Sequence, residues 1–184
     1  GVPYHFADDN IQGAWSHTTW SYYNTMLSKL EKLVPNINHK NKICSGFSSG
    51  GAAIMSLIGR SVEFRNYFHA FMPGGSGWDM GGLAELKGRP MYIFMGDKDS
   101  RVSSYDTLSK DAKAAGIDIT YLRFKGGHGM PTKHFEEMRQ WIQDKVIFRA
   151  LPELRKSISK DFKAKKYAQA YQSAKEILSI TEAG

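Results

Sequence analysis

Ser48 stands in a setting that suits nucleophilic chemistry. It is flanked by Gly46 and Gly50 in the stretch ICSGFSSGGAA, residues 43–53, where an apolar run gives way to small residues. This is the G-x-S-x-G pattern of a nucleophile elbow, a sharp turn from a strand into a helix that exposes the serine hydroxyl. Glycine suits the crowded positions of such a turn because it has no Cβ. A plainer alternative is a turn serine whose hydroxyl binds its own backbone.

A base and a carboxylate follow Ser48 in the order that a catalytic triad needs. A serine hydroxyl is a poor nucleophile until a base takes its proton, and a carboxylate must hold the tautomer of that base. The segment YIFMGDKDSRV offers Asp97 and Asp99, and the segment YLRFKGGHGMP offers His128. Both segments read as strands that end in loops, and the carboxyl ends of parallel strands share one edge of a sheet. We therefore expect a Ser-Asp-His site at that edge, although His128 alone would also suit an ordinary surface histidine.

The elements that must position these residues alternate along the chain. Short apolar runs, typical of strands, are separated by segments with apolar residues at helical spacing. Strand alternating with helix predicts an α/β fold with a mostly parallel sheet and helices on both faces. We expect strands in VPYHFA, KICSGF, YFHAFMPGG, PMYIFMGD and IDITYLRF, and helices over residues 20–34, 51–58, 104–115 and after Pro131.

The sequence changes character near residue 151. Two helical stripes follow, which predict a helical hairpin over residues 151–184 and a main domain over residues 1–150. The stretch FKAKKYAQAYQSAKEIL looks like half of a tetratricopeptide-type helix pair, and a single such pair cannot bury its own face. The hairpin either packs on the main domain or begins a repeat array, and it is a possible protein contact. The stripes consist of Leu151, Leu154, Ile158 and Phe162, and of Ala168, Tyr171, Ala174 and Leu178.

Composition excludes several classes of protein. Hydrophobic residues make up 41% of the 184 residues and charged residues 23%, which argues against disorder. No apolar run approaches the roughly 18 residues of a membrane span. The net charge of +7 is the sole support for a nucleic-acid binder, and the basic residues near the C-terminus read as a solvated helical face. We expect no nucleic-acid partner.

Neither a disulfide nor a metal site is expected. Cys44 is the only cysteine and reads as a small buried residue of a strand. His5, His17, His69 and His134 show no metal-ligand spacing such as H-E-x-x-H, so we expect no metal and no cofactor.

Residues 43–147 resemble the α/β-hydrolases, specifically the carboxylesterase branch with feruloyl-esterase-like, polyhydroxybutyrate-depolymerase-like and phospholipase/carboxylesterase-like proteins. The resemblance rests on GFSSGGA, GRPMYIFMGDKDSRV and AAGIDITYLRFKGGHG. It implies a serine hydrolase that cleaves a small-molecule carboxylic ester through an acyl-enzyme intermediate, and it favours a secreted or periplasmic protein. The same triad leaves peptidase activity open.

The resemblance also assigns roles to single residues. Ser48 would be the nucleophile, His128 the base, and the backbone N–H of Ser49 one oxyanion donor. The family's acid usually stands three residues after the strand-ending glycine and three before a valine. This pattern favours Asp99, whereas Asp97 suits a role in shaping the turn.

The chain departs from the family before Ser48. The family normally has several strands there, one of which precedes a loop that donates a second oxyanion N–H. Here only about 42 residues precede Ile43, and no His-Gly-Gly-Gly type loop is visible. We therefore expect a fold that lacks its N-terminal strands, and a fragment of a longer protein is favoured because the chain opens with Gly1 rather than Met. A non-catalytic α/β-hydrolase-like binding or scaffold module is the alternative.

Overall fold

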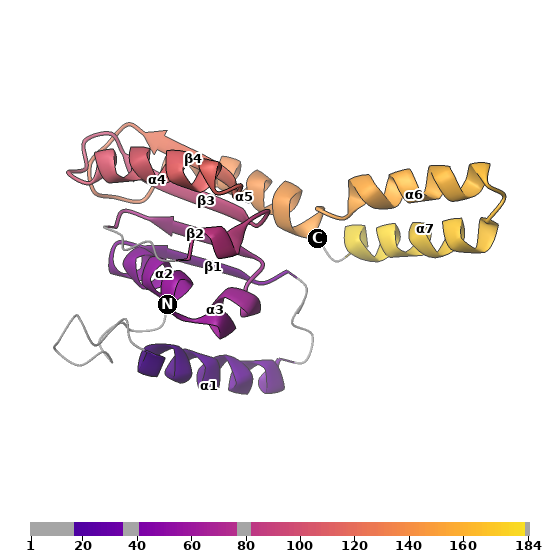
Figure 1. Cartoon of the computed structure of the whole chain (residues 1–184), viewed down its shortest axis with the longest axis horizontal. Coiled ribbons are helices and arrows are strands. Elements are labelled where there is room, and N and C mark those ends of the chain that lie inside the picture. Colours follow the sequence, from indigo (N-terminus) through magenta and orange to yellow (C-terminus); the bar gives the residue numbers. More distant parts are fainter. Residues whose placement is uncertain (1–16, 35–40, 77–81, 183–184) are drawn as a thin grey trace. The chain divides into compact units, whose positions relative to one another are not determined.

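A computed structural model of the chain describes residues 17–34, 41–76 and 82–182 (Figure 1). The chain divides into two compact units, residues 1–132 and 133–184. The strand expected in VPYHFA lies outside the described residues. The domain boundary expected near residue 150 stays a prediction.

The first unit is built on a parallel sheet, as the alternating pattern predicts. Four strands are described, and they lie in the order β1-β2-β3-β4, with each pair of neighbours parallel. Because every connection crosses over, the four C-terminal ends lie at one edge of the sheet (Figure 1). The strands are β1 (Ile43–Phe47), β2 (Ala70–Gly74), β3 (Pro90–Gly96) and β4 (Asp118–Phe124).

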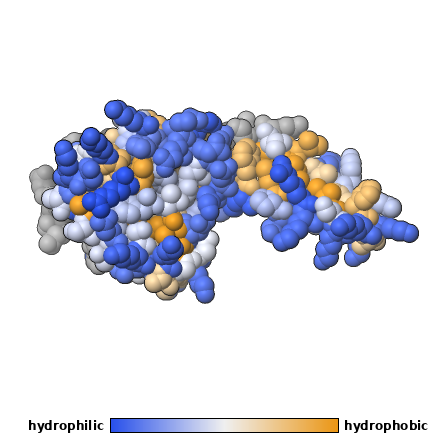
Figure 2. All heavy atoms as spheres, turned by 90° about the horizontal axis from the view of Figure 1, so that it is seen from above, coloured by the Kyte–Doolittle hydropathy of each residue, from blue (hydrophilic) through white to orange (hydrophobic). Residues whose placement is uncertain are grey.

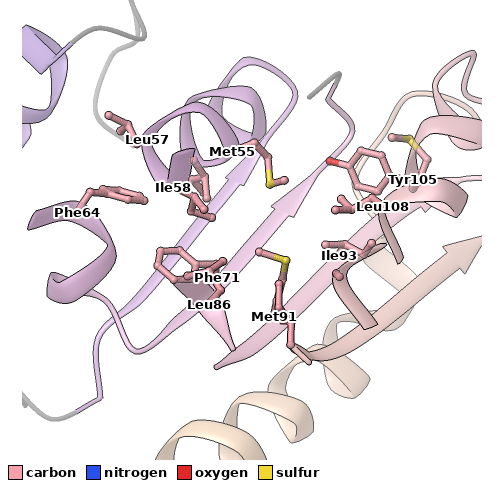
Figure 3. Packing of buried hydrophobic residues seen from close by; sticks show 14 of the residues in the cluster. Met55, Leu57, Ile58, Phe64, Phe71, Leu86, Met91, Ile93, Tyr105 and Leu108 are labelled. Carbon is pink, nitrogen blue, oxygen red and sulfur yellow. The ribbon is translucent and has the colours of Figure 1, made fainter. Parts of the chain in front are cut away.

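Helices of the first unit cover one face of this sheet and enclose an apolar core. Residues of β2 and β3 on this face alternate along the strands. Figure 3 shows Phe71 near Ile58, Met91 below Met55, and Ile93 near Leu108. These side chains are almost completely buried. The elements on this face are α1 (His17–Leu33), α2 (Ser49–Arg60), α3 (Val62–Tyr67), the 3₁₀ turn η3 (Ala84–Leu86) and α4 (Val102–Ala114).

The indole of Trp20 belongs to this core. Its ring meets Phe64 of α3 edge-on, with the ring centroids 5.2 Å apart, and Trp20 is only 5% exposed. Edge-to-face packing of this kind stabilises aromatic pairs beyond the area that they bury. Trp20 therefore anchors α1 on the core of the first unit.

The second unit is helical. The 3₁₀ turn η4 (Thr132–His134) leads into α5 (Phe135–Ile142), which continues as a π-helical turn η5 (Gln143–Ile147). Helices α6 (Leu151–Lys163) and α7 (Tyr167–Glu182) then form the expected hairpin and pack on each other.

Several large apolar residues of the hairpin reach the surface. Figure 2 shows hydrophobic residues in orange among hydrophilic ones in blue on the visible face of this hairpin. The exposed residues are Phe162, Tyr167, Tyr171 and Leu178. No helix within the described ranges is long and apolar enough to cross a bilayer.

Candidate active site

Ser48 occupies a sharp turn between β1 and α2. Its backbone has φ 55° and ψ −118°, in the half of the Ramachandran map that residues with a Cβ rarely adopt. Its N–H donates to the carbonyl oxygen of Gly74 at the end of β2, at 2.9 Å. This bond holds the turn against the neighbouring strand, so the strained conformation is fixed by the sheet edge.

The glycines around Ser48 differ in how strictly the fold requires them. A Cβ on Gly46 would lie 2.6 Å from the backbone of Gly50, and one on Gly51 would lie 2.6 Å from the carbonyl oxygen of Gly74. A Cβ on Gly50 would meet nothing within 4 Å. The close approaches at this turn therefore fall on Gly46 and Gly51, while Gly50 of the G-x-S-x-G pattern has room for a side chain.

Asp99 is a buried residue of the loop that follows β3. Its side chain is only 2% exposed, and Oδ2 lies 2.6 Å from Nδ1 of His128. Its Oδ1 accepts the backbone N–H of Arg101 at 3.0 Å. Burial alone would raise the pKa of Asp99, but the hydrogen bonds from Arg101 and His128 outweigh it and hold the pKa below the usual value. Asp99 is therefore a stable carboxylate at neutral pH.

His128 joins Asp99 to Ser48. It lies in the loop after β4, and its Nε2 is 3.0 Å from Oγ of Ser48. Because Nδ1 faces a carboxylate, the neutral ring carries its proton there and turns the Nε2 lone pair toward the serine hydroxyl. The ring lies against Phe47, with centroids 4.9 Å apart, which restrains its orientation.

Asp97 has a different position from Asp99. Its Oδ1 accepts the backbone N–H of Gly126 at 2.9 Å, and its own N–H donates to the carbonyl oxygen of Phe124 at 2.8 Å. Asp97 thus ties the β3 loop to the loop that carries His128. It is Asp99, and not Asp97, that lies within hydrogen-bonding distance of the imidazole.

One group can be assigned to a developing oxyanion. Ser49 is the first residue of α2, so its N–H lacks an intrahelical acceptor and lies at the positive end of the helix dipole. We assign no second donor from the described residues.

Other reactive groups of the described chain do not form a competing centre. Desolvation raises the pKa of the Cys44 thiol to about 12, so it is not a thiolate at neutral pH. No group of three His, Cys, Asp or Glu residues within the described ranges is arranged to hold a metal ion.

Arg101, whose guanidinium lies beside the imidazole of His128, is a neighbour of the site that the sequence pattern does not single out.

Solved structures of α/β-hydrolases share this architecture. A thermostable esterase aligns with a TM-score of 0.55 at 23% identity, over 67% of this chain and 36% of that protein. The Pyrococcus horikoshii acylaminoacyl peptidase gives a TM-score of 0.55 at 14% identity, over 65% of this chain and 26% of that one. The Bacillus cereus carboxylesterase gives 0.53 at 18% identity, over 67% of this chain and 58% of the carboxylesterase.

These likenesses concern part of each relative. The chain spans about a third of the length of the thermostable esterase and just under three fifths of that of the carboxylesterase. No protein-family model matches the sequence, and a search of curated proteins gave no match. The parallel sheet, its strand order and the structural likeness together show that the chain has the α/β-hydrolase fold.

Proposed function

We propose that the chain is a serine hydrolase that cleaves carboxylic esters through an acyl-enzyme intermediate. The observation that carries the proposal is the continuous contact from Asp99 to Ser48. Oδ2 of Asp99 lies 2.6 Å from Nδ1 of His128, and Nε2 of His128 lies 3.0 Å from Oγ of Ser48. These are the distances that proton transfer from a serine to a histidine base needs.

In the proposed acylation step, Oγ of Ser48 attacks the ester carbonyl while Nε2 of His128 takes its proton. The carbonyl oxygen becomes an oxyanion, and the N–H of Ser49 donates to it. The tetrahedral species then collapses, the bond to the alcohol breaks, and His128 returns the proton to the leaving oxygen. Asp99 stays ionised throughout and stabilises the imidazolium by its charge and hydrogen bond.

Deacylation repeats these steps with water. His128 takes a proton from the water as its oxygen attacks the acyl carbonyl, and the proton passes to Oγ of Ser48 as the acid leaves. An ester suits this site better than a peptide. Alcohols leave more readily than amines, so the acylation step needs less help from the site with an ester than with a peptide.

The direct test is to find the acyl group. The protein is incubated with p-nitrophenyl acetate, quenched in acid, digested and mapped by mass spectrometry. We expect an acetyl group on Ser48 in the wild type and none at this position in Ser48→Ala. Ser45→Ala removes an exposed serine of β1, the strand that precedes Ser48, and is the matched control, which should still be acetylated at Ser48. Acetylation confined to lysines, equal in all three proteins, would contradict the proposal.

A further inference from the structure

Arg101 spans the loops that carry the candidate triad. It is the residue before α4, and its Nη1 lies 3.4 Å from the carbonyl oxygen of Gly75, just beyond β2. The same nitrogen lies 3.3 Å from Nδ1 of His128 and 3.7 Å from Oδ1 of Asp99. The backbone N–H of Arg101 also donates to Oδ1 of Asp99, at 3.0 Å. One residue thus contacts the ends of three loops.

The contact between Arg101 and His128 is electrostatic. Nδ1 of His128 lies 2.6 Å from a carboxylate oxygen of Asp99, so it carries a proton and has no lone pair to offer. A guanidinium nitrogen is always a donor as well. Two donors therefore face each other at 3.3 Å, and the positive charge of Arg101 opposes a second positive charge on the imidazole.

The same charge acts in the opposite direction on Asp99. A guanidinium near a buried carboxylate favours its ionised form, and the backbone N–H of Arg101 adds a hydrogen bond to that form. Arg101 therefore stabilises the charge that the triad needs and disfavours the protonation that would disable the base.

We propose that Arg101 is a positioning residue that fixes Asp99 and keeps the resting imidazole of His128 neutral. Its catalytic consequence rests on the proposed function, since a neutral His128 is the form that can take the serine proton. The charge would extend the working pH range of the site toward acid. The role is distinct from that of Asp99, because Arg101 does not orient the ring through a hydrogen bond of its own.

The other groups that face His128 do not supply this effect. The elbow contributes the Ser48 hydroxyl and the Phe47 ring, which are uncharged. The β3 loop contributes Asp99, which favours the imidazolium. The carboxylate of Asp97 accepts the N–H of Gly126 instead. Among the described groups in contact with the ring, Arg101 is the cation.

The test is a titration of the His128 ring by ¹H–¹⁵N NMR, with the ring signals assigned from their loss in His128→Gln. We compare the wild type with Arg101→Met, which removes the charge, and with Arg101→Lys, which keeps it. We expect the titration midpoint to rise by roughly half a pH unit or more in Arg101→Met, since exposure of the guanidinium screens the effect. It should stay near the wild-type value in Arg101→Lys.

Arg123→Met is the matched control for a general loss of positive charge. Arg123 is half exposed like Arg101, but it forms an ion pair with Asp106 at 3.1 Å. An unchanged midpoint in Arg101→Met, in a protein whose backbone spectrum is native, would overturn the proposal, as would an equal rise in Arg123→Met. If Arg101→Met does not fold, Arg101→Gln provides the same loss of charge with a polar side chain.

This measurement needs no turnover, so its result does not depend on whether the proposed function is correct. Failure of a serine-directed phosphonate to label wild-type Ser48 would count against the hydrolase while leaving the titration readable. Where labelling occurs, its rate can be measured as a function of pH. The acidic limb of this pH profile should move to higher pH in Arg101→Met and not in Arg123→Met.

Discussion

Gly96, the last residue of β3, lies directly against the backbone of Gly127 in the loop after β4. A Cβ added to Gly96 would be 2.2 Å from the carbonyl oxygen of Gly127 and 2.5 Å from that of Gly126. Asp99 stands three residues after Gly96, and His128 comes directly after Gly127. The close approach of the two glycines therefore brings the carboxylate of Asp99 within reach of the imidazole of His128.

Gly96→Ala should therefore displace the His128 loop. We expect a loss of about 1–3 kcal/mol in the free energy of unfolding, the usual cost of an overpacked site, and a larger loss in the rate of Ser48 labelling. Urea unfolding and labelling kinetics measure the two effects. Gly127→Ala is the control, because a Cβ there would meet nothing within 4 Å. Native behaviour in Gly96→Ala would mean that the two loops are not packed as described.

Alanine substitutions at Gly46 and Gly50 of the elbow should likewise differ in their effect on stability and on labelling. Gly46→Ala forces a Cβ to within 2.6 Å of the Gly50 backbone, so we expect it to destabilise the fold and to suppress labelling of Ser48. Gly50→Ala should be tolerated, and it should gain up to about 1 kcal/mol because alanine is the better helix former. Thermal unfolding of both variants, with labelling as the second readout, tests this order. Equal damage from both substitutions would contradict it.

Asp99 should make the free energy of unfolding depend on pH in the acidic range. Its pKa is lowered in the folded protein relative to the ordinary value of 3.8, so its carboxylate contributes stability that is present above that value and is lost as the pH falls through the folded pKa. The free energy of unfolding should fall more steeply below about pH 4 in the wild type than in Asp99→Asn. Urea unfolding at a series of pH values measures both slopes. Asp97→Asn provides the carboxylate control, and identical slopes in wild type and Asp99→Asn would refute this prediction.

Much of the fold could be predicted from the sequence because its strands are short, apolar and bounded by glycine. The runs YFHAFMPGG and PMYIFMGD became β2 and β3, and IDITYLRF became β4. The candidate triad residues were found because each follows such a strand. Parallel strands bring their C-terminal ends to one edge, so sequence order was enough to place Ser48, Asp99 and His128 near one another.

Features that depend on a few local contacts cannot be predicted from the hydrophobic pattern. Helix α3 has only six residues, too few for periodicity to show, and the signal was its cap, since the Ser61 hydroxyl accepts the N–H of Phe64 at 3.1 Å. The π-helical turn η5 continues the helix before it and has no pattern of its own.

Close approaches between segments also cannot be read from a motif. The motif points to Gly46 and Gly50, whereas in the structure the positions without room for a Cβ are Gly46 and Gly51. No sequence motif indicates the position of Arg101, because its contacts with Gly75 and His128 join residues that lie 26 and 27 positions apart in the sequence.

The most direct test of the hydrolase proposal is the reaction of Ser48 with a fluorophosphonate, read by mass spectrometry of the digested protein. Such a probe needs an activated serine hydroxyl, and it does not need turnover. We expect one adduct, on Ser48, formed far more slowly in His128→Gln and absent in Ser48→Ala, with Ser45→Ala reacting like the wild type. The proposal would be contradicted if Ser48 stayed unmodified in the folded wild-type protein, or if His128→Gln reacted as fast as the wild type. Either result would favour a non-catalytic binding module.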